Sequence, residues 1–179
     1  MVKDRAYQIV LLAMIAALYT ALSLVLAPFS FGNIQVRIAE ALTLLPIILP
    51  SSVWAITLGC FLTNLIGVLT GVNILGILDV IVGTLVTLIA ALLTKKLAKY
   101  RYNSYPFIST IPPIILNALV IGLELTFVLN PLKNFSLPFF ILMFVEVFMG
   151  QFISIFILGL PLIHQLEKKE ILKGIRKNS

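Results

Sequence analysis

The sequence predicts an all-α integral membrane protein, a bundle of six transmembrane helices with both termini in the cytoplasm. Of the 179 residues, 60% are hydrophobic and only 11% are charged, which is far from the composition of a soluble domain. The apolar residues form runs long enough to cross a bilayer, and short segments rich in Pro, Gly, Asn or basic residues separate them. We expect residues 1–179 to form a single membrane domain.

The first two runs differ in length. Residues 6–27 form a run of 22 residues without a convincing small-residue cleavage site, and further spans follow it. We therefore expect a helix that stays in the protein rather than a signal peptide. Residues 38–49 number only 12, and Pro50, Ser51 and Ser52 end this run with a break and plausible helix-cap residues. Such a segment barely crosses a core of about 30 Å and needs a tilt or help from its flanks.

The four later runs are ordinary candidates for spans. We expect helices over residues 53–69, 75–93, 112–129 and 137–163. The second of these stops before Lys95 and Lys96, and the third begins at a Pro-Pro pair, which the first turn of a helix tolerates.

The basic residues predict the orientation. With six spans and an inside N-terminus, 11 of the 13 lysines and arginines lie inside: Lys3, Arg5, Lys95, Lys96, Lys99, Arg101, Lys168, Lys169, Lys173, Arg176 and Lys177. Arg37 and Lys133 remain outside, so the positive-inside bias is strong. Contact with anionic lipid explains the net charge of +6, and no nucleic acid partner is needed.

In this orientation, acidic residues on four different helices lie in the outer half of the membrane: Glu40, Asp79, Glu124 and Glu146. Asn117 lies seven residues deeper than Glu124 on the same helix face. Ionisable groups at membrane depth are costly, so each of them is a candidate functional residue. Convergence of these groups is the strongest functional signal in the chain.

Simpler explanations exist for each acid. A single buried carboxylate can pair with a neighbour or bond the backbone, and Arg37 with Glu40 could be an i,i+3 pair at the membrane surface. One arginine cannot neutralise four acids, however. Some acids must be protonated, or a ligand must supply donors or positive charge. Asn117 with Glu124 would suit the N–H-rich edge of a guanine-like base, which a carboxylate can accept through both oxygens.

The first helix carries small residues every four positions, namely Ala13, Ala17 and Ala21. This spacing allows another helix to approach closely, and internal packing is the alternative explanation.

Other chemistries find no support in the residues. The chain has no G-x-x-x-x-G-K-[ST] phosphate loop, so it is not itself a P-loop ATPase. With one cysteine, Cys60, and one histidine, His164, we expect no metal site, no cofactor and no intramembrane hydrolase.

The segment GNIQVRIAEALTLLP, residues 32–46, resembles the signature of the queuosine-precursor transporter (QueT) family. Members of this family are substrate-binding S components of energy-coupling factor (ECF) transporters. The resemblance implies a six-helix fold of the S-component type in the bacterial plasma membrane. It also implies docking of the alanine stripe on a transmembrane T component, which rests on two cytoplasmic ATPase subunits.

The implied ligand is a 7-deazaguanine, such as 7-aminomethyl-7-deazaguanine or queuine. Glu124 and Glu146 would read the guanine-like edge, and Asn117 would donate to the carbonyl of the base. The aminomethyl cation would meet Asp79 or Glu40. The loop that contains Asn33, Gln35 and Arg37 would close over the site.

Three alternatives remain open at this point. The chain could be an S component for another nitrogenous vitamin, or a stand-alone carrier that uses the acids as a proton relay. A purely structural membrane protein would leave the acid cluster without a purpose, and an enzyme has the least support.

Overall fold

The computed structural model describes residues 2–31, 36–131 and 134–169, and this part of the chain is built from helices and turns. In chain order the elements are α1 (Val2–Val25), α2 (Ala27–Ser30), η1 (Ile38–Ile47), α3 (Ser52–Leu69), α4 (Ile77–Leu97), η2 (Phe107–Thr110), α5 (Ile111–Leu129), α6 (Leu137–Gln151), η3 (Phe152–Gly159) and α7 (Leu160–Lys168). The predicted all-helical class is confirmed.

Among the described residues, five helices are long and apolar enough to cross a membrane. The last of them is the continuous helix Leu137–Lys168, which comprises α6, η3 and α7. The segment predicted as the second span is the shorter apolar helix η1. A count of six spans and the cytoplasmic placement of the termini therefore stay predictions.

Two helices run further than the sequence pattern predicts. α4 continues through Lys95 and Lys96 to Leu97, and the last helix continues past residue 163 to Lys168. Lysine is a good helix former, and its charge is favourable in the last turn of a helix. A lysine therefore marks the edge of the apolar segment better than it marks the end of the helix.

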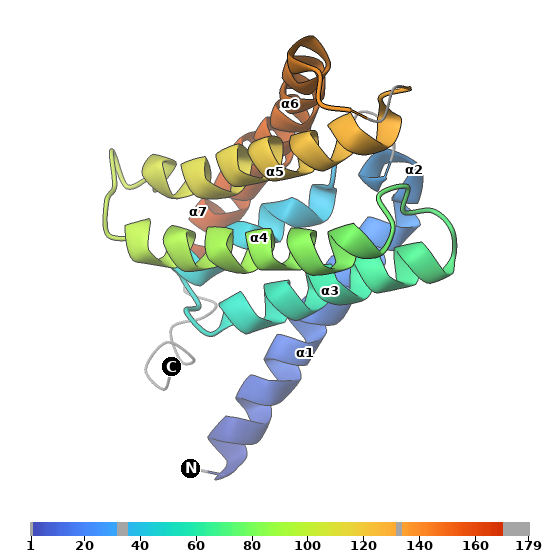
Figure 1. Cartoon of the computed structure of the whole chain (residues 1–179). Helices are drawn as coiled ribbons and strands as arrows, with labels where there is room; N and C mark the ends of the chain where they lie inside the picture. The colour runs from blue at the N-terminus through green and yellow to red at the C-terminus, as the bar shows by residue number, and fades with distance from the viewer. Residues whose placement is uncertain (1, 32–35, 132–133, 170–179) are drawn as a thin grey trace.

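The long helices pack as a partial ring around η1. α1 contacts α3, α3 contacts α4, α4 contacts α5, and α5 contacts α6. η1 contacts η3, α4, α1, α3 and α7. Figure 1 shows α3, α4 and α5 lying side by side, while the N-terminal part of α1 projects beyond the other helices.

η1 is a 3₁₀ helix of 10 residues, and every residue from Ala39 to Ile47 is buried. At about 2.0 Å per residue it spans about 20 Å, compared with about 15 Å as an α-helix. Pro46 cannot donate a backbone hydrogen bond, and the Thr43 hydroxyl donates to the Glu40 carbonyl at 2.6 Å. The sequence indicates a segment that needs a tilt or help from its flanks to cross the membrane, and its crossing stays a prediction. The short segment lies inside the bundle.

Glycine allows the closest contact between α1 and α3. A Cβ on Gly59 would lie 2.8 Å from the Tyr19 Cβ and 3.0 Å from the Ala16 carbonyl oxygen. The buried face of α1 therefore contains Ala16 and Tyr19, whereas the predicted stripe of Ala13, Ala17 and Ala21 is exposed. Packing within this chain does not explain the stripe.

Candidate functional site

Arg37 is the residue that joins the start of η1 to α4. Its Nη2 atom lies 3.2 Å from Asp79 Oδ2, and its Nε donates to the Ser30 carbonyl at 3.1 Å. Its guanidinium also lies 5.0 Å from the centre of the Phe31 ring. The side chain is buried, so a surface pair between Arg37 and Glu40 is not present in the described structure. Arg37 is an internal counter-ion for α4.

Asp79 lies in the first turn of α4, where a helix favours negative charge. Besides Arg37, its Oδ2 accepts a hydrogen bond of 2.9 Å from Asn73 Nδ2. Its other oxygen, Oδ1, is buried and has no partner among the described residues. A Cβ on Gly83 would overlap this oxygen, so glycine one turn further along α4 makes room for the carboxylate.

Two asparagines hold the start of α4 in place. Asn64 of α3 donates from Nδ2 to the Asp79 backbone carbonyl at 3.0 Å, and its own Oδ1 has no partner in the part of the chain described. Asn73 accepts from the Leu75 N–H at 3.0 Å while it donates to the Asp79 side chain. These bonds fix where the carboxylate points.

Glu40 is almost completely buried and bonds to the first helix. The Tyr19 hydroxyl donates to Glu40 Oε1 at 2.5 Å, and Oε2 is left without a partner among the described residues. The charges of Arg37 and Asp79 act on Glu40 as well. The second carboxylate therefore belongs to the same electrostatic cluster as the ion pair.

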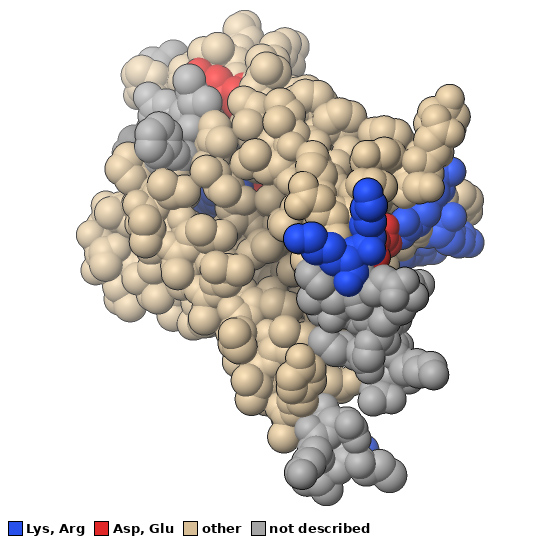
Figure 2. Space-filling view, turned by 180° about the vertical axis from the view of Figure 1, so that it is seen from behind, with Lys and Arg blue, Asp and Glu red and all other residues tan. Residues whose placement is uncertain are grey.

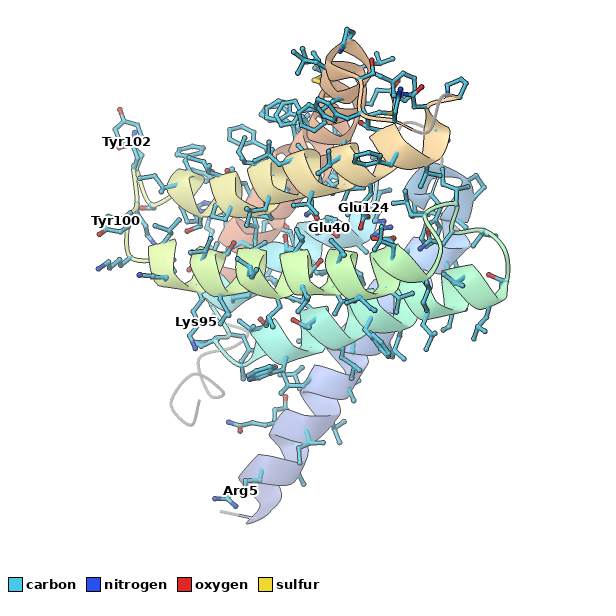
Figure 3. All side chains as sticks on the ribbon, viewed as in Figure 1. Arg5, Glu40, Lys95, Tyr100, Tyr102 and Glu124 are labelled. Carbon is cyan, nitrogen blue, oxygen red and sulfur yellow. The ribbon has the colours of Figure 1, made fainter. Side chains whose placement is uncertain are left out.

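Glu124 of α5 is 6% exposed, and neither of its carboxylate oxygens has a partner within the described ranges. The charges of Asp79 and Arg37 act on it from α4 and from the start of η1. Asn117 lies on the same buried side of α5, and one N–H of its amide donates to the Pro113 carbonyl at 2.9 Å. Figure 3 shows the labelled side chains of Glu40 and Glu124 in the interior of the bundle.

The other predicted site residues have a different status. Glu146 of α6 is half-buried, and its Oε2 is buried without a described partner. In the described structure no hydrogen bond or ion pair joins Glu146 to Arg37, Glu40 or Asp79. Asn33 and Gln35 lie outside the described residues.

The structure thus brings together Arg37, Glu40, Asp79 and Glu124, which we call the acidic cluster. The guanidinium contacts one of the three carboxyl groups, that of Asp79, and its charge acts on the other two. Five buried acceptor oxygens in and beside the cluster have no described partner: Glu40 Oε2, Asn64 Oδ1, Asp79 Oδ1, and Glu124 Oε1 and Oε2. Leaving such groups without partners costs about 1–3 kcal/mol each, and more when they are charged. The cluster is chemically suited to a ligand with several N–H donors or a positive charge.

A pocket of about 260 Å³ lies beside the cluster. Its lining includes Ala27, Pro28, Phe31 and Val72, and Phe31 is the ring beneath Arg37. The pocket therefore adjoins the cluster without including the carboxylates in its described lining.

The residue patterns miss two contributors to the cluster, Tyr19 and Asn73. Tyr19 lies among apolar residues, where the sequence pattern predicts that an aromatic ring only packs against its neighbours. One feature of the sequence could have indicated its burial: Tyr19 comes three residues after Ala16, on the helix face opposite the alanine stripe. Asn73 precedes Asp79 by six residues in a turn-forming segment, so it reads as a turn residue.

Among the described residues, no group of three or more His, Cys, Asp or Glu side chains is placed to hold a metal ion.

Comparisons with known proteins agree with a transport function. The family model described as QueT transporter matches residues 9–168. The chain is also 37% identical over 91 residues to the queuosine precursor transporter QueT of Lactococcus lactis subsp. cremoris (strain MG1363). That alignment covers 50% of this chain and 50% of the relative. No solved structure matches the chain.

Proposed function

The chain belongs to the QueT transporter family, and we propose that it is the substrate-binding subunit of an importer for a queuosine precursor. It is a multi-pass protein of the cell membrane. The proposed ligand is a 7-deazaguanine, such as 7-aminomethyl-7-deazaguanine or queuine. The similarity to the Lactococcus protein, whose name states this substrate class, supports the choice.

The observation that carries the proposal is the excess of buried acceptors in the acidic cluster. A guanine-like edge presents two adjacent N–H donors, which one carboxylate can accept through both of its oxygens. Glu124 has two such oxygens with no described partner. The acidic cluster contains three carboxyl groups and only one arginine. Repulsion from the excess carboxyl groups would oppose the binding of an anionic vitamin.

The roles follow from this chemistry. Glu124 reads the guanine-like edge together with Glu146, and the free N–H of the Asn117 amide donates to the carbonyl of the base. Asp79 or Glu40 meets the aminomethyl cation, because each keeps one buried oxygen without a described partner. Arg37, Asn33 and Gln35 complete the site from the segment that follows α2.

ATP hydrolysis in this proposal belongs to partner subunits. The chain docks through the exposed stripe of Ala13, Ala17 and Ala21 on the T component of an ECF transporter, and two cytoplasmic ATPase subunits supply the energy. Small exposed residues at this spacing support close helix packing against a membrane partner.

Calorimetric titration of the purified protein tests the ligand assignment. We expect binding of 7-aminomethyl-7-deazaguanine and queuine, and no binding of riboflavin or thiamine. The reverse pattern would overturn the assignment and favour an S component for another vitamin. Uptake by vesicles that contain this chain but no ATPase would instead favour a stand-alone proton-coupled carrier.

A further inference from the structure

Asn64 of α3 carries a buried acceptor that no described residue uses. The side chain is completely buried, and its Nδ2 donates to the Asp79 backbone carbonyl at 3.0 Å. This bond fixes the amide, because a rotation by 180° would bring two carbonyl oxygens together. Oδ1 is left as an acceptor without a partner in the described part of the chain. A donor from outside the chain would therefore be favourable here.

The Asn64 amide lies beside the free oxygen of Asp79. Gly83 shows their proximity, since a Cβ on this residue would overlap Asp79 Oδ1 and lie 3.0 Å from Asn64 Nδ2. The Asp79 side chain is completely buried as well, and α3 packs directly against α4. We call Asn64 Oδ1 and Asp79 Oδ1 the acceptor pair, one oxygen from an amide and one from a carboxylate.

The ion pair with Arg37 leaves the acceptor pair available. Arg37 and Asn73 both bond to the other carboxylate oxygen, Oδ2. Glu40 and Glu124 add two more carboxyl groups to the acidic cluster, which has a single guanidinium. A second positive charge would therefore reduce the excess of acid in the cluster.

Basic side chains of α4 lie far from the acceptor pair. Asp79 is in the first turn of α4, whereas Lys95 and Lys96 are in its last turn. Figure 2 shows most of the visible Lys and Arg side chains gathered on one side of the molecule, on the right of this view. The charge of Asp79 instead acts on Glu124, from the neighbouring helix α5. A cation at the acceptor pair thus has carboxyl groups around it rather than lysines.

We propose that the acceptor pair binds the ammonium group of the transported ligand, which makes Asn64 a specificity-determining residue. The inference rests on the proposed function, in which Glu124 reads the base edge of a 7-deazaguanine. The aminomethyl group of such a ligand is on the five-membered ring, at the opposite end from that edge. An ammonium group has three N–H donors, so it can serve a carboxylate oxygen and an amide oxygen together. The cation is thereby assigned to Asp79 rather than to Glu40, because Asn64 lies beside Asp79.

Calorimetric titration with two ligands of the same shape tests the inference. 7-Aminomethyl-7-deazaguanine carries the ammonium group, and 7-ethyl-7-deazaguanine has a methyl group in its place. We expect the unmodified protein to bind the aminomethyl compound on the order of 100-fold more tightly. The readout is the ratio of the two dissociation constants, because a general loss of structure changes both constants alike.

Two variants and a control locate the ammonium group. Asn64→Leu removes the amide and keeps a side chain of similar size, so it should reduce the ratio about 10-fold. Glu40→Gln should leave most of the ratio in place, because the cation lies on Asp79. Thr94→Val is the matched control: it also removes a buried hydrogen bond to a backbone carbonyl, at the far end of α4, and should leave the ratio unchanged.

Equal affinity of the unmodified protein for the two ligands would overturn the inference and leave the proposed function standing, since a deazaguanine would still bind. Failure of both ligands to bind would refute the proposed function itself. An Asn64→Leu protein that loses affinity for both ligands equally would make Asn64 only a brace for the Asp79 backbone. A larger fall in the ratio for Glu40→Gln than for Asn64→Leu would place the cation on Glu40. Either of the last two results would also overturn the inference.

Discussion

Replacing Glu124 by glutamine separates the contribution of this carboxyl group to binding from its contribution to stability. The side chain keeps its shape and one acceptor oxygen. The second oxygen becomes an NH₂ group, which would face an N–H donor of the proposed ligand. Binding and stability should therefore change in opposite directions.

The size of both effects follows from the environment of Glu124. A hydrogen bond to a charged group contributes about 1.5–3 kcal/mol, so the loss of one acceptor should weaken ligand binding about 10- to 150-fold. In the structure both oxygens are buried without described partners. A neutral amide costs less to bury than a carboxylate, so unfolding should require up to about 1 kcal/mol more. For a protein of this size, that corresponds to a Tm increase of about 2–4 °C.

Calorimetry with 7-aminomethyl-7-deazaguanine and thermal unfolding in the same detergent measure the two quantities. Glu167→Gln is the matched control, because Glu167 is bonded to Arg101 at the other end of the bundle. It should lower stability slightly and leave ligand affinity unchanged. A Glu124→Gln protein that is clearly less stable but binds as tightly as before would refute the reasoning, since Glu124 would then be a structural residue.

Three further substitutions test the packing around the site and the exposed alanine stripe of α1. Gly83→Ala places a Cβ where Asp79 Oδ1 lies, so it should lower the unfolding free energy by about 1–3 kcal/mol and weaken ligand binding. Thermal unfolding and calorimetry measure the two effects, and unchanged values would contradict the geometry. Tyr19→Phe removes the donor to Glu40, which should cost about 1–3 kcal/mol in denaturant unfolding, and an unaltered midpoint would mean that the bond contributes nothing. Ala17→Leu, on the exposed face of α1, should leave Tm and ligand affinity unchanged but abolish co-purification with the T component; joint loss of affinity would point to a folding role.

Composition and hydropathy were sufficient to predict the long helices, because lipid contact requires runs of apolar residues. The same signal cannot distinguish an apolar residue that faces lipid from one that faces other helices. The residues of η1 are therefore predicted as a span, although nine of the ten are buried in the bundle. η1 packs against η3 and α4, and no local sequence pattern contains these contacts.

The sequence predicts which residues form the candidate site better than it predicts which of these residues contact one another. Charges at membrane depth identify Arg37, Glu40, Asp79 and Glu124. Nearest-neighbour rules then pair Arg37 with Glu40, three residues away, whereas the structure pairs it with Asp79, 42 residues away. Tyr19, the actual partner of Glu40, has no charge and reads as part of an apolar helix. Tertiary contacts of this kind are invisible to spacing rules.

The enclosure of η1 also has a consequence for biogenesis. Ten residues flanked by Arg37 and containing Glu40 are too short and too polar to partition into a bilayer as an independent segment. Moving the Arg37 guanidinium out of water costs less free energy once it pairs with Asp79 of α4. Burying the Glu40 carboxyl group likewise costs less once Tyr19 of α1 donates to it. We therefore expect α1, η1, α3 and α4 to integrate as one cooperative unit, with η1 entering the membrane only after α4 has been synthesised.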